Sequence, residues 1–298
     1  MTECYVCPHR CGVERSESIH TPAGSYGSCH CGMLPIVARA ALHMWEEPVI
    51  SGTKGSGAVF FSGCNLHCCF CQNYEISCLD HGKEISVARL QQIYQELIAQ
   101  GAHNINLVTP THFAVAILQS LEKRLPVPVV YNSSGFDAVD TLRKFKGKVQ
   151  IYLPDLKYTD DVLAIKYSNA PYYFRVATEA IKEMYRQTGP YKLNADALME
   201  SGVIIRHLIL PGHLENSKRV IDWVAQNFKP GQVMFSLMHQ YVPCGNAAKY
   251  PEINRKLTAE EYQEIENYLF ASGIEDGFVQ EEEAASGDFI PKFDGTGV

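Results

Sequence analysis

The sequence lacks the segments that would place it in a membrane or direct it out of the cell. Across its 298 residues no apolar run approaches the roughly 18 residues of a membrane span, and the stretch MTECYVCPHRCGVER has no apolar signal core. It also lacks a polybasic block, and its 26 basic and 33 acidic residues give a formal net charge of −7. This balance disfavours binding to nucleic acid. We expect a cytoplasmic protein with no membrane and no nucleic-acid partner.

Glycine motifs that grip nucleotide phosphates are missing as well. No GxGxxG follows the first strand-like run and no GxxxxGK(S/T) occurs, so no sequence motif indicates a fold that binds nucleotide phosphates in this way. Cysteine, in contrast, is abundant, with eleven residues. In a reducing compartment that number indicates metal ligation or redox chemistry rather than disulfides. The cysteines form two groups, from Cys4 to Cys31 and from Cys64 to Cys78, and Cys244 stands apart.

Apolar strand-like runs alternate with helical patterns from residue 58 onward, which predicts a parallel α/β core. Polar or small residues follow the runs, as they do where the strand ends of a βα-barrel converge on one site. We predict an α/β fold with an open, partial (β/α)6 barrel, a Cys-rich N-terminal extension (1–52), a barrel core (53–245) and a C-terminal helix and short tail (246–298). The predicted strands are 58–61, 105–108, 127–131, 149–153, 203–210 and 233–237, and the clearest helices are 87–100, 112–124 and 217–228.

Three cysteines stand close together in the loop after the first predicted strand. Cys64, Cys68 and Cys71 have the spacing C-x3-C-x2-C, and three thiolates can hold three irons of a 4Fe-4S cluster. The fourth iron would lack a protein ligand and would be open to a substrate or cofactor. Two alternatives are three buried structural cysteines and a zinc site, although a catalytic zinc more typically recruits His or carboxylate ligands.

The loop resembles the signature of the radical S-adenosylmethionine (radical SAM) superfamily, CxxxCxΦC with an aromatic residue at Φ, here Phe70. The resemblance extends from about Ala58 to Val242 and implies the partial barrel of that superfamily. Within the superfamily it is closest to pyruvate formate-lyase activating enzyme and its PflX-type relatives. The shared pieces are WEEPVISG (45–52), FFSGCNLHCCFCQN (60–73), TPTH (109–112), PDLKY (154–158), IIRHLILPG (204–212) and LMHQY (237–241).

The resemblance implies an oxidoreductase that uses a 4Fe-4S cluster and S-adenosylmethionine (SAM). In such enzymes SAM binds the open iron through its amino and carboxylate groups, and an electron from flavodoxin or ferredoxin cleaves it to methionine and a 5′-deoxyadenosyl radical. The radical then removes hydrogen from a substrate, which in an activase is a glycine of a glycyl radical enzyme. The alternatives are modification of a small molecule or peptide, and a non-catalytic iron-sulfur or zinc protein.

The resemblance also implies roles for individual residues. Phe70 is expected to contact adenine, and Thr109 to Thr111 replace a Gly-Gly-Glu that lies near the methionine amino group. Asn132, Ser133 and Ser134 stand where the activating enzymes have Asp-Thr-Asn-Gly, and the alternative for them is turn chemistry.

Charged residues at the later strand ends complete this set. Arg206 is expected to contact the SAM carboxylate, while Asp155 and Lys157 orient the substrate region. A structural ion pair of Asp155 with Lys157 or Arg206 is the alternative, because an unpaired buried charge is costly. His239 and Gln240, after the last predicted strand, are further candidates for the cofactor site.

The N-terminal cysteines suggest a second metal site. Cys4, Cys7, Cys11 and Cys29 could hold a structural zinc or an auxiliary iron-sulfur cluster, because their spacing suits two halves of a zinc ribbon. The resemblance favours these four over Cys31. The first fifty or so residues have little periodic hydrophobicity, so a metal or docking onto the barrel must order them. The metal-free alternative is a buried hairpin packed against the barrel.

Overall fold

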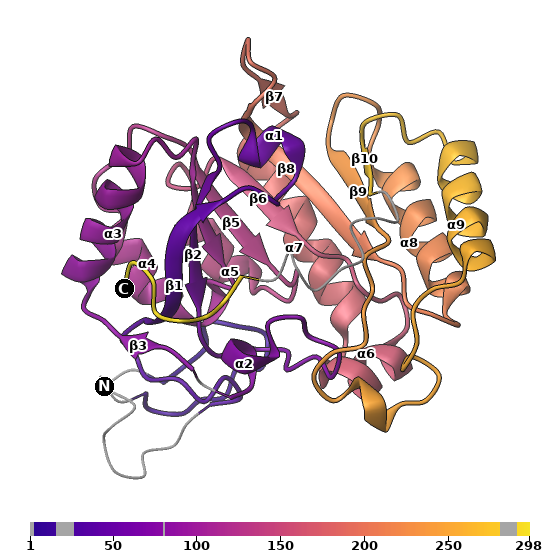
Figure 1. Ribbon diagram of the computed structural model, residues 1–298, viewed down its shortest axis with the longest axis horizontal. Helices are drawn as coiled ribbons and strands as arrows, with labels where there is room; N and C mark the ends of the chain where they lie inside the picture. Colours follow the sequence, from indigo (N-terminus) through magenta and orange to yellow (C-terminus); the bar gives the residue numbers. More distant parts are fainter. Residues whose placement is uncertain (1–2, 16–26, 80, 281–290) are drawn as a thin grey trace.

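The computed structural model describes residues 3–15, 27–79, 81–280 and 291–298, and these fold around one sheet (Figure 1). The sheet is ten-stranded, with the order β10-β9-β8-β6-β5-β4-β2-β1-β3 and β7 paired to β8. Its strands are β1 (Ile36–His43), β2 (Ser56–Phe61), β3 (Lys83–Glu84), β4 (Ile105–Val108), β5 (Val129–Ser133), β6 (Ile151–Pro154), β7 (Lys192–Leu193), β8 (Met199–Leu208), β9 (Met234–Met238) and β10 (Gly277–Val279).

The six predicted strands correspond to β2, β4, β5, β6, β8 and β9, which all run parallel. The predicted α/β fold with an open barrel is therefore confirmed. Four strands of the described residues were not predicted: β1, β10 and the two-residue strands β3 and β7. β1 lies inside the expected N-terminal extension and pairs antiparallel with β2, and β10 adds a further parallel strand to β9. Among the strands of the described residues the sheet does not close, because β10 and β3 are its two ends.

The helices cover the sheet between consecutive strands. They are α1 (Pro48–Ser51), α2 (Tyr74–Ser77), α3 (Val87–Ala99), α4 (Ala114–Ser120), α5 (Val139–Lys144), α6 (Asp161–Ser168), α7 (Tyr173–Thr188), α8 (Leu214–Asn227) and α9 (Ala259–Ala271), with 3-10 turns at Thr111–Phe113 and Ala247–Lys249. The predicted helix 87–100 corresponds to α3. The predicted helix 217–228 corresponds to α8, which begins three residues earlier and ends one residue earlier. The predicted helix 112–124 ends early, at Ser120. No helix in the described part of the chain has both the length and the apolar character needed to cross a membrane.

Local capping explains where three of the helices begin. The Ser86 side chain accepts a hydrogen bond from the backbone N–H of Arg89 at the start of α3, and Asp160 accepts one from Val162 at α6. At α9, Thr258 and Glu261 form a reciprocal capping box. Each cap satisfies backbone donors that the first helical turn leaves without a partner.

The amino ends of the parallel strands are sealed by α1. In Figure 1, α1 lies at the opposite end of the strands from α2, which follows the cysteine loop. Val49 and Ile50 of α1 are buried in an apolar cluster that also contains Val130, Ile151, Leu153, Met199, Ile204 and Met234. These partners lie in the strands of the barrel, mostly near their amino ends. The interior of the barrel is therefore accessible from the carboxyl ends of the strands, where the cysteine loop lies.

Buried His207 on β8 predicts a pH dependence of stability. Its Nδ1 donates to the Leu156 carbonyl at 2.7 Å, and its Nε2 accepts from Ser217 Oγ at 2.8 Å. Burial lowers the pKa of His207 to about 4. The unfolded chain therefore binds more protons between about pH 4 and 6.5, so the stabilisation is present above this window and is lost as pH falls through it.

We expect this histidine to cost roughly 2 kcal/mol of unfolding free energy on going from about pH 7 to about pH 5. Chemical denaturation of the wild type and of His207→Gln at both pH values measures the effect. The variant should lose less stability on acidification than the wild type. An equal loss in both would assign the acid sensitivity to other groups.

Candidate functional site

A pocket of about 240 Å³ lies at the carboxyl ends of the parallel strands. Cys64, Cys68 and Cys71 line it, together with Phe70 from the same loop. The later strands contribute Thr109, Asn132, Ser133, Ser134, Asp155, Lys157 and Arg206. The structure thus brings most of the residues that were predicted from separate strand ends into one cavity, as expected for a βα-barrel.

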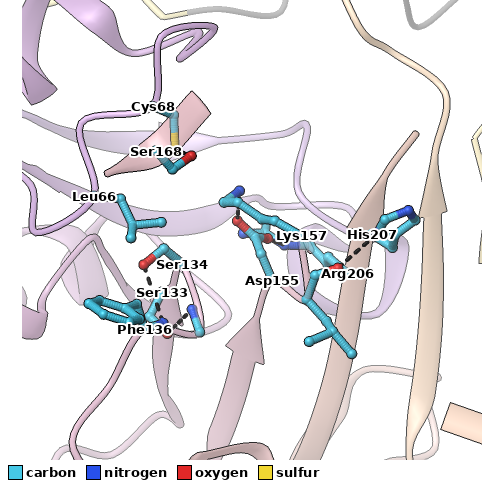
Figure 2. A network of polar contacts seen from close by, with 12 residues as sticks. Leu66, Cys68, Ser133, Ser134, Phe136, Asp155, Lys157, Ser168, Arg206 and His207 are labelled. Carbon is cyan, nitrogen blue, oxygen red and sulfur yellow. Dashed lines mark hydrogen bonds and ion pairs between the residues drawn. The ribbon is translucent and has the colours of Figure 1, made fainter. Parts of the chain in front are cut away.

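The backbone of the cysteine loop is held by residues from distant parts of the chain. The Cys69 N–H donates to the Tyr167 carbonyl at 2.8 Å, and the Cys69 carbonyl accepts from the Asn246 N–H at 2.7 Å. Side-chain sulfurs also have donors: Ser168 Oγ lies 3.0 Å from Cys68 Sγ (Figure 2), and the Leu66 N–H lies 3.4 Å from Cys64 Sγ. Hydrogen bonds of this kind favour the thiolate form.

Neighbouring cysteines of the same loop have different surroundings. Cys69 and Cys78 line a separate surface pocket with Lys166, Tyr167 and Tyr250, not the cavity of the other three cysteines. The structure therefore separates Cys64, Cys68 and Cys71 from Cys69, although Cys69 adjoins Cys68 in sequence.

The donor set of the cavity fits an iron-sulfur cluster. Burial raises the pKa of the Cys64 thiol to about 12 and that of Cys68 to about 11, and it also raises the pKa of Cys71. Charges on the neighbouring thiolates add to the rise for Cys64 and Cys68. Three thiolates in one cavity, two of them buried and that of Cys71 partly buried, thus need a strong positive charge, which a bound cluster would supply.

Within the described residues, no three Cys, His, Asp or Glu side chains form a group that could hold a single metal ion. A cubane cluster differs from a single ion because each cysteine binds its own iron. The three thiols therefore need to face one cavity but do not have to converge on one point. This geometry fits a cluster better than the zinc alternative for the 64–71 loop.

Phe70 is buried in the wall of the cavity. Its ring centroid lies 5.8 Å from that of Tyr241 and 6.5 Å from that of Tyr167. These aromatic contacts fix the ring in place at the edge of the pocket. The position is compatible with the predicted contact to an adenine ring, which remains a prediction.

Arg206 lies at the centre of a buried network of charges (Figure 2). Its Nε donates to Asp155 Oδ1 at 2.9 Å and its Nη2 donates to Asn132 Oδ1 at 2.6 Å. Lys157 Nζ donates to the other oxygen of Asp155 at 2.6 Å. Burial raises the pKa of Asp155, but the charges of Arg206 and Lys157 outweigh it and leave the pKa below its usual value. The structure thus shows the ion pair that was the alternative for these residues.

The residues after β5 form a tight turn as well as lining the cavity. Ser133 Oγ donates to Asp137 Oδ2 at 2.6 Å and accepts from the Gly135 N–H at 3.2 Å. Gly135 has a φ of +76°, and a Cβ there would lie 2.2 Å from the Asp155 carbonyl oxygen. Glycine is therefore required at this turn. Turn chemistry accounts for the Ser133 hydroxyl, while Ser134 and Thr109 line the cavity.

Two residues expected at the cofactor site face elsewhere. Thr111 is buried and donates to Asp137 Oδ1 at 2.7 Å, because the 3-10 turn at 111–113 directs it into the protein. His239 stacks on Tyr262 with ring centroids 3.9 Å apart. Its neighbours Met238 and Gln240 line the cavity instead, and successive side chains of an extended segment point to opposite sides. Neither Thr111 nor His239 is among the residues that line the cavity, and a role of either in the cofactor site stays a prediction.

Glu46 and Glu47 also line the cavity, and the sequence analysis did not single them out. Glu46 Oε2 accepts from Arg206 Nη1 at 3.4 Å, and its Oε1 accepts from Asn132 Nδ2 at 3.2 Å. Glu47 Oε1 accepts from Ser236 Oγ at 2.8 Å. The sequence feature that could have indicated these two residues is the segment WEEPVISG, in which Glu46 and Glu47 directly precede the short buried helix α1.

The N-terminal cysteines lie near one another without forming a single-ion site. Burial raises the pKa of Cys7 to about 12, and the charges of Cys29, Cys11 and Cys4 add to the rise. Polar contacts dock this segment onto the barrel: a ring nitrogen of His9 lies 2.6 Å from the Asn65 carbonyl, and Arg15 donates to the carbonyls of Cys31 and His112. As noted, the described residues offer no group that could hold a single ion. These docking contacts agree with the metal-free alternative, and a zinc or an auxiliary iron-sulfur cluster at Cys4, Cys7, Cys11 and Cys29 stays a prediction.

If docking contacts alone order residues 3–15, we expect the triple variant Cys64→Ala, Cys68→Ala, Cys71→Ala to remain folded with no zinc above background. Elemental analysis of the purified variant measures this. Zinc near one equivalent would contradict the docking account and support a structural zinc site. Residual iron and sulfide would instead show the auxiliary cluster.

Comparison with known proteins agrees with the cysteine site. The sequence family described as a 4Fe-4S single cluster domain matches residues 51–151, which contain all three cavity cysteines. The expected 4Fe-4S cluster is thereby confirmed.

The chain is also 31% identical over 278 residues to the uncharacterized protein MJ0674 of Methanocaldococcus jannaschii, covering 89% of this chain and 73% of that protein. It belongs to the same family as this archaeal protein.

Two solved structures resemble the fold at low sequence identity. Streptococcus suis SuiB bound to S-adenosylmethionine has a TM-score of 0.48 and 11% identity, covering 73% of this chain and 48% of SuiB. Methylornithine synthase (PylB) has a TM-score of 0.49 and 15% identity, covering 72% of this chain and 60% of the synthase. The chain spans about half the length of SuiB.

Proposed function

We propose that this protein is a radical SAM enzyme. The observation that carries the proposal is the separation of cysteines within one loop: Cys64, Cys68 and Cys71 face the cavity together, while Cys69 faces another pocket. A cluster held by three cysteines keeps one iron open, which suits binding and activation of a cofactor better than simple electron transfer.

Cys64, Cys68 and Cys71 would hold a cluster that, when reduced, would supply the electron for cleavage of the S–C5′ bond of SAM; the products would be methionine and a 5′-deoxyadenosyl radical able to remove a hydrogen atom from the substrate. The electron comes from a reduced flavodoxin or ferredoxin, and 5′-deoxyadenosine leaves with the hydrogen. The protein's part is to position the reacting carbon and to exclude water and other hydrogen donors.

Residues around the cavity suit these tasks. Phe70 offers a ring for adenine, while the hydroxyls of Thr109 and Ser134 are available for polar groups of the nucleoside or the methionine moiety. Apolar side chains complete the lining and limit water near a radical; these are Phe60, Leu66, Val108, Leu208 and Met238.

Two substrate classes follow from the sequence, a glycine in a glycyl radical enzyme and a small molecule or peptide. The floor of the cavity favours the second class, because it carries the buried carboxylates of Glu47 and Asp155 and the partly buried carboxylate of Glu46. A backbone glycine has no charged group to pair with them, whereas a substrate with a positively charged group does.

Release of 5′-deoxyadenosine tests the proposal. The cluster is reconstituted without oxygen, the protein is reduced with dithionite in the presence of SAM, and 5′-deoxyadenosine and methionine are quantified by mass spectrometry. We expect both products from the wild type and from the matched control Cys69→Ala, and neither from Cys64→Ala. A wild type with a full cluster that releases no more than Cys64→Ala would refute the proposal.

A further inference from the structure

Glu47 differs from the other charged residues of the cavity because one of its oxygens has no partner. The residue is 4% exposed and lines the cavity. Its Oε1 accepts from Ser236 Oγ at 2.8 Å, whereas its Oε2 is buried and has no hydrogen-bond partner among the described residues. Although Glu47 directly precedes α1, its side chain makes no capping bond there. A buried acceptor without a donor is costly, and such groups are commonly explained by a ligand.

The charges around Glu47 do not balance. The cavity floor holds three carboxylates, Glu46, Glu47 and Asp155, and two cations, Lys157 and Arg206. Both cations are in direct contact with other acids: Lys157 lies 2.6 Å from Asp155, and Arg206 lies 2.9 Å from Asp155 and 3.4 Å from Glu46. Asp155 and Glu46 each form an ion pair, but Glu47 forms none among the described residues. One further positive charge would neutralise the surplus negative charge at the floor of the cavity.

We propose that Glu47 binds the protonated amine of the substrate, so that the enzyme acts on a molecule that carries an aliphatic ammonium group. This inference rests on the proposed function and names its substrate class. An ammonium donates to carboxylate oxygen and neutralises the surplus charge, and such charge-assisted bonds are strong in a buried site. A substrate carboxylate would add a fourth negative charge to the same floor.

The position of Glu47 orients such a substrate. Glu47 contacts Ser236, two residues closer to the amino end of β9 than Met238, which also lines the cavity. Below it, Val49 and Ile50 of α1 seal the barrel. The ammonium therefore binds at the closed end, and the rest of the molecule extends toward the cysteines. The carbon that loses hydrogen is on this side of the substrate, away from the amine.

Burial agrees with this assignment. It raises the pKa of Glu47 above the usual value, Arg206 lowers it, and the charges of Glu46 and Asp155 raise it further. An ammonium bound at Oε2 opposes this rise and holds the carboxylate ionised. Glu47 is thus a binding residue of the substrate pocket and takes no part in the chemistry at the cysteines.

Binding of n-butylammonium tests the proposal without turnover. The cluster-loaded protein is titrated near neutral pH by calorimetry with butylamine hydrochloride, with 1-butanol as the neutral control, before and after saturation with SAM. We expect the amine to bind in both cases, 1-butanol to bind more weakly, and Glu47→Gln to weaken amine binding at least about tenfold, as for loss of a charge-assisted bond. Glu122→Gln, at an exposed position, should bind like the wild type.

Several results would overturn this inference. They are absence of amine binding, equal affinity in Glu47→Gln with an unchanged melting temperature, equal binding of 1-butanol, and displacement of the amine by SAM, which would place Glu47 in the SAM site. Failure of the proposed function has a different signature. In that case butylammonium still binds through Glu47, but SAM neither binds nor yields 5′-deoxyadenosine.

Discussion

Replacing Cys68 by alanine is expected to remove the cluster and, with it, all cleavage of SAM. The same loss is expected for Cys64→Ala and Cys71→Ala, because in the proposed function each of the three thiolates holds one iron and two thiolates alone would not retain the cluster. Iron and sulfide content after anaerobic reconstitution measures the first effect, and 5′-deoxyadenosine release measures the second. Activity should fall to the level of protein without iron.

Cys69→Ala and Cys78→Ala are the matched controls. Both cysteines belong to the same stretch of chain but line the surface pocket beside Tyr167. These variants should keep the iron content and the electron paramagnetic resonance (EPR) signal of the reduced cluster. A comparable loss of iron in Cys69→Ala and Cys68→Ala would contradict the assignment of ligands.

Replacing Arg206 by alanine is expected to lower the free energy of unfolding by about 3 to 5 kcal/mol, the usual cost of breaking a buried ion pair from one side. Arg206 is in contact with Asp155, Glu46 and Asn132. Its removal leaves the buried Asp155 with Lys157 as its remaining ion-pair partner and leaves Glu46 without an ion pair among the described residues. Arg206→Lys should recover only part of the loss, because one ammonium cannot reproduce the planar set of donors.

Denaturant unfolding of the wild type and both variants measures this loss, and equilibrium dialysis with SAM shows whether Arg206 also binds the cofactor. If Arg206 acts only through its ion pairs, Arg206→Ala loses stability, and any loss of SAM affinity is an indirect effect of the rearranged side chains at the floor of the cavity. An Arg206→Ala protein of unchanged stability with weakened SAM binding would instead favour the direct contact that the resemblance implied.

The barrel was predictable because each of its strands is a local apolar run. The run at 105–108 coincides with β4, and polar residues at the strand ends gave the location of the site. The direction in which a single side chain points was harder to predict than the strands. His239 lies between two residues that line the cavity but packs on Tyr262, and alternation along an extended segment decides this.

The acidic floor could not be found by reading along the chain. Glu46 meets Arg206, a residue 160 positions away, and this contact depends on how the segment before α1 enters the barrel. The segment was visible as WEEPVISG, but sequence reasoning placed it in the N-terminal extension, outside the barrel core. Contacts between residues so far apart in the sequence depend on how the strands assemble into the sheet, and the local pattern of residues along the chain does not reveal them.

The EPR spectrum of the reduced cluster, recorded with and without SAM, tests the central claim most directly. The claim is that Cys64, Cys68 and Cys71 hold a cluster with one iron open to SAM. The account predicts a reduced-cluster signal that changes shape when SAM is added, in the wild type and in Cys69→Ala alike. A signal that is identical with and without saturating SAM, in protein with full iron content, would contradict it.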